Sequence, residues 1–275
     1  MKKQPVFIIM KLPILLIIIL FAEISYSQTV THRYMIVRTL PLYTLQVNLN
    51  YNQSVLELAG TYNDDVHSVQ IYEGTTFGTD KGFGGNIVSK INLDRRGQIR
   101  FTQTVAFNRI LSYTFGKKAT LADQGHANYN AFTGALGLEY NFTPSHRFKI
   151  YIGADINASI INGETRIWFY GIEGQLGDST ADYNIKNTFR MGFGVDFGSE
   201  FLLNSDIGIH VAVKFLDLNV FLRKSEGTND DAEFKLRDAD SPGLRFAGNK
   251  SFAFYSIIAG ASFYFGIGEK RYKLK

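Results

Sequence analysis

The hairpin from Ala131 to Ile160 constrains the fold more than any other stretch, because its residues alternate between apolar and polar. The apolar residues of its first arm share one parity: Phe132, Leu136, Leu138, Tyr140 and Phe142. A turn at Thr143–Arg147 leads to a second arm with the same pattern. A period of two indicates strands, since successive side chains point to opposite faces of a sheet. Each arm exceeds the roughly 5–6 residues of an average strand, which suits a wall between lipid and a polar interior.

The composition favours a single β domain. The chain has 275 residues with Gly 26, Phe 23, Tyr 15, only Pro 5, and no Cys. The lack of cysteine excludes a disulfide framework and thiolate metal sites.

The N-terminal segment predicts export. Lys2 and Lys3 precede an apolar run at Leu12–Ala22, and Ser25–Ser27 supplies small residues for cleavage. We therefore expect a signal peptide over residues 1–27, a mature start at Gln28 and a periplasmic lead-in over residues 28–42.

The charge of the mature chain excludes a nucleic-acid partner. Loss of residues 1–27 lowers Lys+Arg from 29 to 26 and Asp+Glu from 25 to 24, a net charge of about +2, with no basic face. No later segment holds 18 consecutive apolar residues, which excludes a helical membrane protein and leaves a barrel as the way to cross a membrane.

The alternation predicts eight antiparallel strands joined by three short and four long connections. The strands are expected at Tyr43–Leu58, Asn86–Leu93, Gln98–Ser112, Ala131–Phe142, Phe148–Ile160, Thr188–Phe197, Ile207–Leu222 and Phe252–Phe265. The long connections are expected at Ala59–Gly85, Gly116–Asn130, Asn162–Asn187 and Arg223–Ser251, and the short ones at Asp94–Gly97, Thr143–Arg147 and Gly198–Asp206. A parity change after Phe215 predicts a bulge near Leu216.

This alternation of short turns and long loops is typical of an all-β, eight-stranded antiparallel transmembrane β-barrel in the bacterial outer membrane. We expect the barrel over residues 43–265, short turns in the periplasm, long extracellular loops and a basic periplasmic tail over residues 266–275. A ten-stranded variant stays open, because Tyr34–Leu40 and Val66–Tyr72 can each be read as a strand.

Over residues 43–265 the chain resembles small outer-membrane β-barrels of the OmpA/OmpX type. The segment FYSIIAGASFYF looks like the C-terminal strand signal that the barrel-assembly machinery reads, with Tyr255, Ile257, Phe263 and Phe265 on one parity. It departs from that pattern because GIGEKRYKLK follows. The resemblance implies outer-membrane lipid and the assembly machinery as partners. It does not imply the cell-wall tether of OmpA, because no peptidoglycan-binding pattern follows residue 265 in the sequence.

The inward parity carries charged residues, which the narrow lumen of an eight-stranded barrel must pair. They are Lys90, Arg100, Glu139, Lys149, Asp155, Arg190, Asp196, His210 and Lys214. We expect Glu139 and Lys149 to lie opposite each other as a cross-strand pair. A plug of paired charges is favoured over a narrow pore for ions or small solutes.

A lipid-modifying hydrolase would need a nucleophile with a base in reach. His210 is the histidine expected on an inward strand face, and no Ser pairs with it in the sequence pattern. We therefore expect no catalytic residues, no metal and no cofactor.

The cluster Trp168, Phe169 and Tyr170 contains the single tryptophan of the sequence. It is read either as part of the outer aromatic girdle or as an exposed patch for an extracellular partner. The function that follows is structural or interactive, carried by the surface loops.

Overall fold

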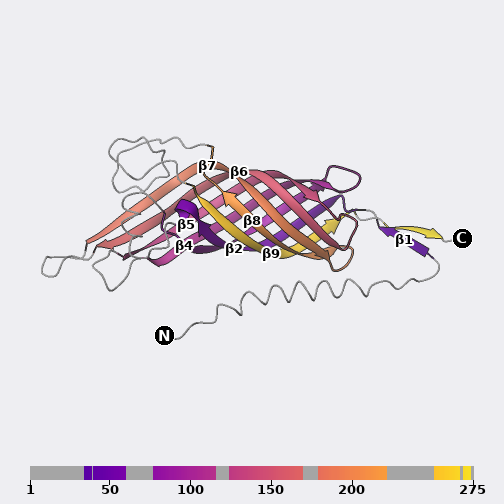
Figure 1. The fold of residues 1–275 in the computed structure, drawn as a ribbon, viewed down its shortest axis with the longest axis horizontal. Coiled ribbons are helices and arrows are strands. Elements are labelled where there is room, and N and C mark those ends of the chain that lie inside the picture. The colour runs from indigo at the N-terminus through magenta and orange to yellow at the C-terminus, as the bar shows by residue number, and fades with distance from the viewer. Residues whose placement is uncertain are drawn as a thin grey trace, which may run out of the picture. The chain divides into compact units, whose positions relative to one another are not determined.

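Eight strands form one closed barrel. The computed structural model describes residues 34–38, 40–59, 77–115, 124–169, 179–221, 251–266 and 269–273. Within the barrel, each strand pairs antiparallel with its neighbour in sequence, and β9 closes the ring by pairing with β2 (Figure 1). The strands are β2 (Tyr43–Val55), β3 (Lys81–Asn92), β4 (Ile99–Phe115), β5 (Gln124–Asn141), β6 (Phe148–Phe169), β7 (Ser179–Leu202), β8 (Ile207–Asp217) and β9 (Ala253–Phe265). The predicted fold class and strand count are confirmed.

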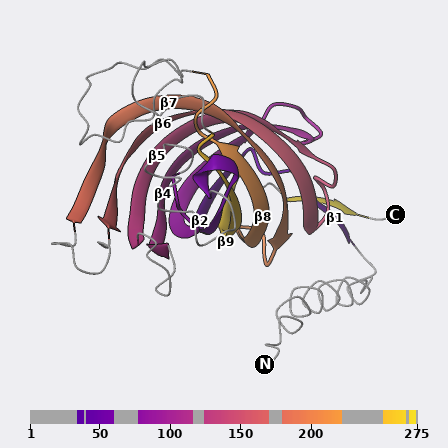
Figure 2. The same ribbon diagram turned by 60° about the vertical axis from the view of Figure 1, so that its left-hand side comes forward.

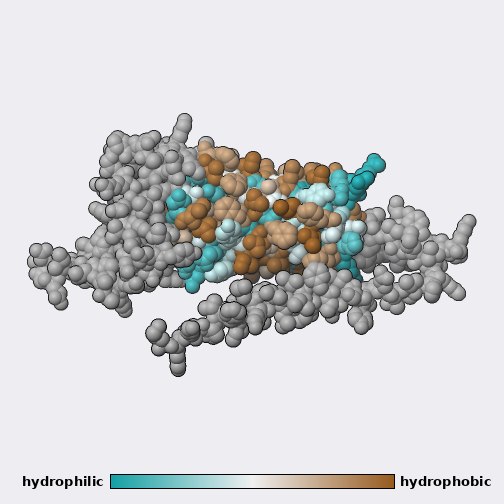
Figure 3. All heavy atoms as spheres, viewed as in Figure 1, coloured by the Kyte–Doolittle hydropathy of each residue, from teal (hydrophilic) through white to brown (hydrophobic). Residues whose placement is uncertain are grey.

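The outer face of the barrel is apolar. Large hydrophobic side chains lie exposed on the outward parity, and five of them are 57–77% exposed: Leu49, Phe83, Leu136, Ile156 and Phe197. Figure 3 shows mostly hydrophobic residues over the middle of the barrel on one face, with hydrophilic ones toward both ends. Such a band is typical of a surface that faces lipid, because exposing it to water would be energetically unfavourable.

A separate two-stranded sheet joins the lead-in to the tail. β1 (Tyr34–Arg38) pairs antiparallel with β10 (Glu269–Lys273), and neither strand belongs to the barrel. The ten-stranded alternative is therefore wrong for the lead-in: this segment is a strand, but its partner is the tail. Val66–Tyr72 and the predicted signal peptide lie outside the described residues.

Several strands are longer than the sequence pattern predicts (Figure 2). β6 has 22 residues and β7 has 24, so most of the connection expected at Asn162–Asn187 is strand. β3 and β5 also begin earlier than expected, at Lys81 and Gln124. The alternation fails at these ends because a strand that leaves the membrane no longer needs one apolar face.

The bulge predicted near Leu216 is wrong. The pairing of β8 with β7 and β9 keeps one register up to Asp217, where the strand ends. Leu218 then turns inward and is fully buried. The parity change thus reports the end of a strand rather than an extra residue within it.

Short turns join the strands at one end of the barrel. Residues 93–98, 142–147 and 203–206 make these turns, whereas the opposite end carries the longer connections. Its rim includes one turn of 3-10 helix, η1 (Leu56–Leu58). No helix among the described residues is long and apolar enough to cross a membrane. We call the two ends the short-turn end and the loop end.

The barrel lumen as candidate functional site

Four charged side chains form a square near the short-turn end of the lumen, which we call the ionic square. Lys90 on β3 and Arg100 on β4 alternate with Glu139 on β5 and Glu200 on β7. The Lys90 Nζ lies 2.7 Å from Glu139 Oε2 and 2.8 Å from Glu200 Oε1. Arg100 Nη2 lies 3.0 Å from Glu200 Oε1 and also pairs with Glu139. Each carboxylate therefore faces both cations, and the square is electrically neutral.

Neutral donors complete the coordination of Glu200. Gln46 Nε2 donates to Glu200 Oε1 at 3.0 Å, and the Tyr264 hydroxyl donates to Oε2 at 3.1 Å. Glu200 is completely buried. A buried charge of this kind needs both opposite charges and hydrogen bonds, and residues on β2, β3, β4 and β9 supply them to Glu200.

Two lysine ammonium groups in this region make cation–π contacts with tyrosine rings. The Tyr151 ring centroid lies 4.1 Å from Lys90 Nζ, and that of Tyr264 lies 4.7 Å from Lys149 Nζ. Tyr151 lies opposite Gly198 on β7, and a Cβ added at that glycine would come within 2.4 Å of the Tyr151 hydroxyl. The glycine thus gives the ring room to lie across the lumen next to the cations.

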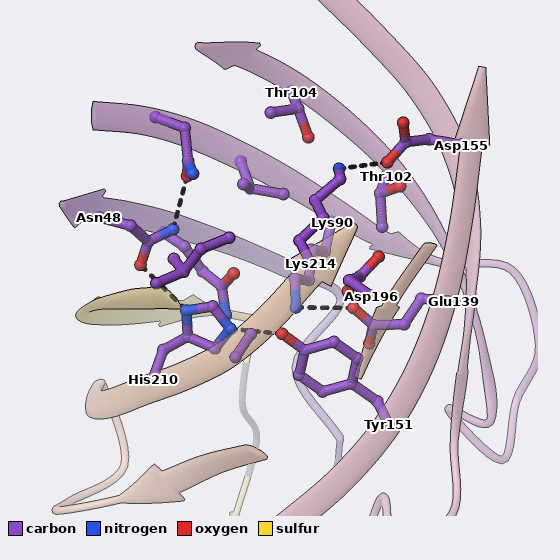
Figure 4. A pocket seen from close by; sticks show the side chains of 15 residues that line it. Asn48, Lys90, Thr102, Thr104, Glu139, Tyr151, Asp155, Asp196, His210 and Lys214 are labelled. Atoms are coloured by element: carbon purple, nitrogen blue, oxygen red, sulfur yellow. Dashed lines mark hydrogen bonds and ion pairs between the residues drawn. The ribbon is translucent and has the colours of Figure 1, made fainter. Parts of the chain in front are cut away.

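A small cavity follows in the middle of the lumen (Figure 4). Its volume is about 40 Å³, room for roughly three water molecules. Lys214 pairs with Asp155 at its wall, and Asp196 lies opposite Lys214 in the register of β7 and β8. Lys90 and Glu139 of the ionic square also line the cavity, so three carboxylates and two ammonium groups surround it.

His210 also lines this cavity. Its Nε2 shares a hydrogen bond with the Tyr151 hydroxyl, and its Nδ1 lies 3.0 Å from Asn48 Oδ1. Asn48 in turn donates to Asn86 Oδ1 at 2.7 Å. Asn86 donates to Asn50 at 2.9 Å, and Asn50 donates to Asn108 at 3.3 Å. His210 is therefore one member of a chain of amide hydrogen bonds.

Apolar side chains fill the loop end of the lumen, and we call this cluster the apolar plug. Phe77, Tyr129 and Phe252 pack edge to face, with ring centroids 5.5–6.0 Å apart. The plug consists of Leu58, Phe77, Ile110, Ala127, Tyr129, Ala131, Ile161, Leu216, Leu218, Phe252 and Phe254. The lumen is thus closed by charge near one end and by apolar packing at the other.

The predicted pair of Glu139 with Lys149 is wrong. Glu139 lies opposite Arg100 on β4 and Gly153 on β6, whereas Lys149 lies opposite Glu200 on β7. The Thr143 side chain closes the turn by donating to the Phe148 carbonyl and accepting from the Ile150 N–H. The register of β5 and β6 is therefore centred on residue 146, whereas pairing of Glu139 with Lys149 would centre it on residue 144.

The structure places the other predicted lumen residues on inward-facing positions with low exposure. Lys90, Arg100 and Glu139 come together in the ionic square, and Asp155, Asp196 and Lys214 meet at the cavity. Arg190 is buried apart from both groups, opposite Ser159, and its Nη1 donates to the Phe189 carbonyl. Their functional role stays a prediction.

Sequence reasoning missed Glu200, which has the most partners of the buried charges described here. It was assigned to the turn Gly198–Asp206, but β7 continues to Leu202. The signal was present, because Glu200 continues the inward parity of Arg190 and Asp196.

The other predicted contact residues are only partly described. Trp168 and Phe169 belong to β6, where they lie opposite Thr180 and Ser179 of β7, and Tyr170 lies outside the described residues. In β9, Tyr255, Ile257 and Phe265 are about half exposed on the outer face, and Phe263 shares their parity. Recognition of this strand by the assembly machinery stays a prediction.

Among the described residues, no group of three or more His, Cys, Asp or Glu is placed to hold a metal ion.

No protein-family model and no curated protein matches the chain. The solved structures that resemble it include Neisserial surface protein A (12% identity, 81% of this chain and 97% of the other, TM-score 0.44). They also include outer membrane protein OprG from Pseudomonas aeruginosa (12%, 82% and 97%, TM-score 0.40) and outer membrane protease OmpT from Escherichia coli (8%, 91% and 100%, TM-score 0.34). Identities and scores this low carry no argument about function, and the architecture rests on the strand pairing itself.

The strand pairing, the outer band and the filled lumen lead to one conclusion. The apolar band would be unfavourable in water. A closed ring of strands leaves no backbone hydrogen-bonding group unpaired at a strand edge, as a lipid environment requires. The chain is a closed eight-stranded antiparallel β-barrel with the apolar outer surface of a transmembrane protein.

Proposed function

We propose that the protein is a closed outer-membrane barrel with a structural or surface-interaction role, carried by the connections at its loop end. The observation that supports this most is the double closure of the lumen by the ionic square and the apolar plug. A conducting barrel would need a continuous water-filled path through both the ionic square and the apolar plug.

The ionic square is costly to open. An ion passing Lys90, Arg100, Glu139 and Glu200 must separate charges that are each at most 3% exposed. Removing one partner of a buried ion pair typically costs about 3–5 kcal/mol. The square therefore favours a static lumen.

The second candidate is a narrow channel for ions or small solutes. The observation that favours it is the polar cavity of about 40 Å³ beside Asp155, Asp196 and Lys214. This cavity lies between the ionic square and the apolar plug, so a channel would require both closures to open.

A membrane-embedded hydrolase has less support. His210 contacts the Tyr151 hydroxyl and the Asn48 amide, which do not form the Ser–His–acid set of such enzymes. The described residues thus support a non-enzymatic role.

The test is single-channel recording of the refolded chain Gln28–Lys275 in planar bilayers, after heat-modifiable gel migration has shown that the barrel is folded. The expected result is a folded barrel without conducting steps. Stable steps that persist across preparations would overturn the closed-lumen proposal and favour the channel.

A further inference from the structure

The short-turn end presents three arginines on two neighbouring turns. Arg95 and Arg96 lie in the turn between β3 and β4, and Arg147 lies in the turn between β5 and β6. All three are exposed, as is the neighbouring His146. The third short turn differs, because its charged residue is Asp206.

The two arginine turns lie side by side. β4 and β5 are paired neighbours, and the Asn141 N–H donates to the Gln98 carbonyl at 2.7 Å, at the last position before both turns. A Cβ added at Gly97 would lie 3.5 Å from the Pro144 Cβ. The arginines therefore share one sector of the rim.

The carboxylate in this sector is engaged by the backbone. Asp94 accepts hydrogen bonds from the N–H groups of Arg96 and Ile99, at 3.1 and 2.9 Å. These two hydrogen bonds stabilise the turn and hold the Asp94 carboxylate on backbone donors.

The outer face fixes the depth of these arginines in the membrane. Leu93 and Phe142, the first residues of the two turns, are 59% and 53% exposed. Tyr140 packs edge to face on Phe142, with ring centroids 5.0 Å apart. Apolar and aromatic residues of such a band occupy the boundary between acyl chains and headgroups. The arginines just beyond them then reach the phosphate layer.

We propose that Arg95, Arg96 and Arg147 form a binding site for the phosphate groups of anionic phospholipids in the membrane leaflet that the short turns face. A guanidinium group binds a phosphate through two parallel N–H···O hydrogen bonds. Each Lys or Arg near an anionic leaflet contributes about 1 kcal/mol to membrane binding. The site anchors one sector of the barrel to the leaflet. It is independent of whether the lumen conducts.

The experiment is a titration of the delipidated barrel in detergent with phosphatidylglycerol or phosphatidylcholine, read by native mass spectrometry. We expect wild type to bind phosphatidylglycerol more tightly than phosphatidylcholine. R95Q/R96Q should weaken phosphatidylglycerol binding by roughly 25-fold, about fivefold for each charge, and R147Q by about fivefold.

The matched control is K81Q/R109Q, which removes two exposed positive charges at the loop end. It should keep the preference for phosphatidylglycerol. An equal loss in both double variants, or no lipid preference in wild type, would overturn the site. Inorganic phosphate at 10-fold excess over lipid should leave the lipid bound, and displacement by it would overturn the assignment to a lipid headgroup. Heat-modifiable migration of each variant confirms that it is folded.

Discussion

Glu200 is the residue on which the ionic square depends. Its carboxylate pairs with both Lys90 and Arg100 and accepts hydrogen bonds from Gln46 and Tyr264. E200Q should therefore lower the free energy of unfolding by about 3–5 kcal/mol, because two buried cations lose half of their compensation. The measurement is urea unfolding of the barrel in lipid vesicles. The control E164Q changes an exposed strand residue and should alter stability by less than about 0.5 kcal/mol. Equal effects of the two substitutions would contradict the role of the square.

Tyr151 combines a hydroxyl contact with a ring contact. Its hydroxyl shares a hydrogen bond with His210, and its ring faces Lys90 at 4.1 Å. Y151F should cost about 1 kcal/mol, since it removes only the hydroxyl. Y151L should cost a further 0.5–2 kcal/mol or so through the lost cation–π contact, in addition to any packing loss. The same unfolding assay separates the two, and equal stability of Y151F and Y151L would show that the ring contact contributes nothing.

At the scale of elements, the two closures of the lumen act in series. F77A removes a buried ring from the apolar plug and should cost about 3–5 kcal/mol. It should not conduct, because the ionic square still blocks the other end. R100A/E139A removes one cross-strand pair without changing net charge and should also stay closed. Only the combination of F77A with R100A/E139A should give conducting steps in planar bilayers.

Two outcomes would argue against closure in series. Conductance in F77A alone would mean that the ionic square does not block ions. A silent but folded triple variant would mean that other lumen residues, such as the amide chain from Asn48 to Asn108, form the barrier. The lipid-facing control F83A should remain closed, because its side chain points out of the barrel.

The elements show where sequence reasoning succeeds and where it fails. Strands inside the membrane, such as the arm from Phe148 to Ile160, follow a strict two-residue period because lipid and lumen demand opposite chemistry. β6 and β7 continue past that region, where both faces meet similar surroundings and the period disappears. The inward position of Lys90 or Asp155 follows from parity alone. Which residues they pair with depends on the register between neighbouring strands. Between β5 and β6, the hydrogen bonds of the Thr143 hydroxyl in the turn set that register.

At the scale of the whole molecule, the orientation of the barrel decides which leaflet each rim meets. We expect the short turns in the periplasm and the long connections outside the cell, which is the usual orientation of outer-membrane barrels. The sequence lacks cysteine, so a single introduced thiol reports its own location without interference. D230C, in the connection between β8 and β9, should react with a membrane-impermeant maleimide on intact cells. S145C, exposed in the turn between β5 and β6, should react only after the outer membrane is permeabilised. The reverse pattern would invert the barrel and would move Arg95, Arg96 and Arg147 to the outer leaflet. The expected pattern places those arginines at the inner, phospholipid leaflet, whose anionic headgroups match their charge. It also places the long connections on the cell surface.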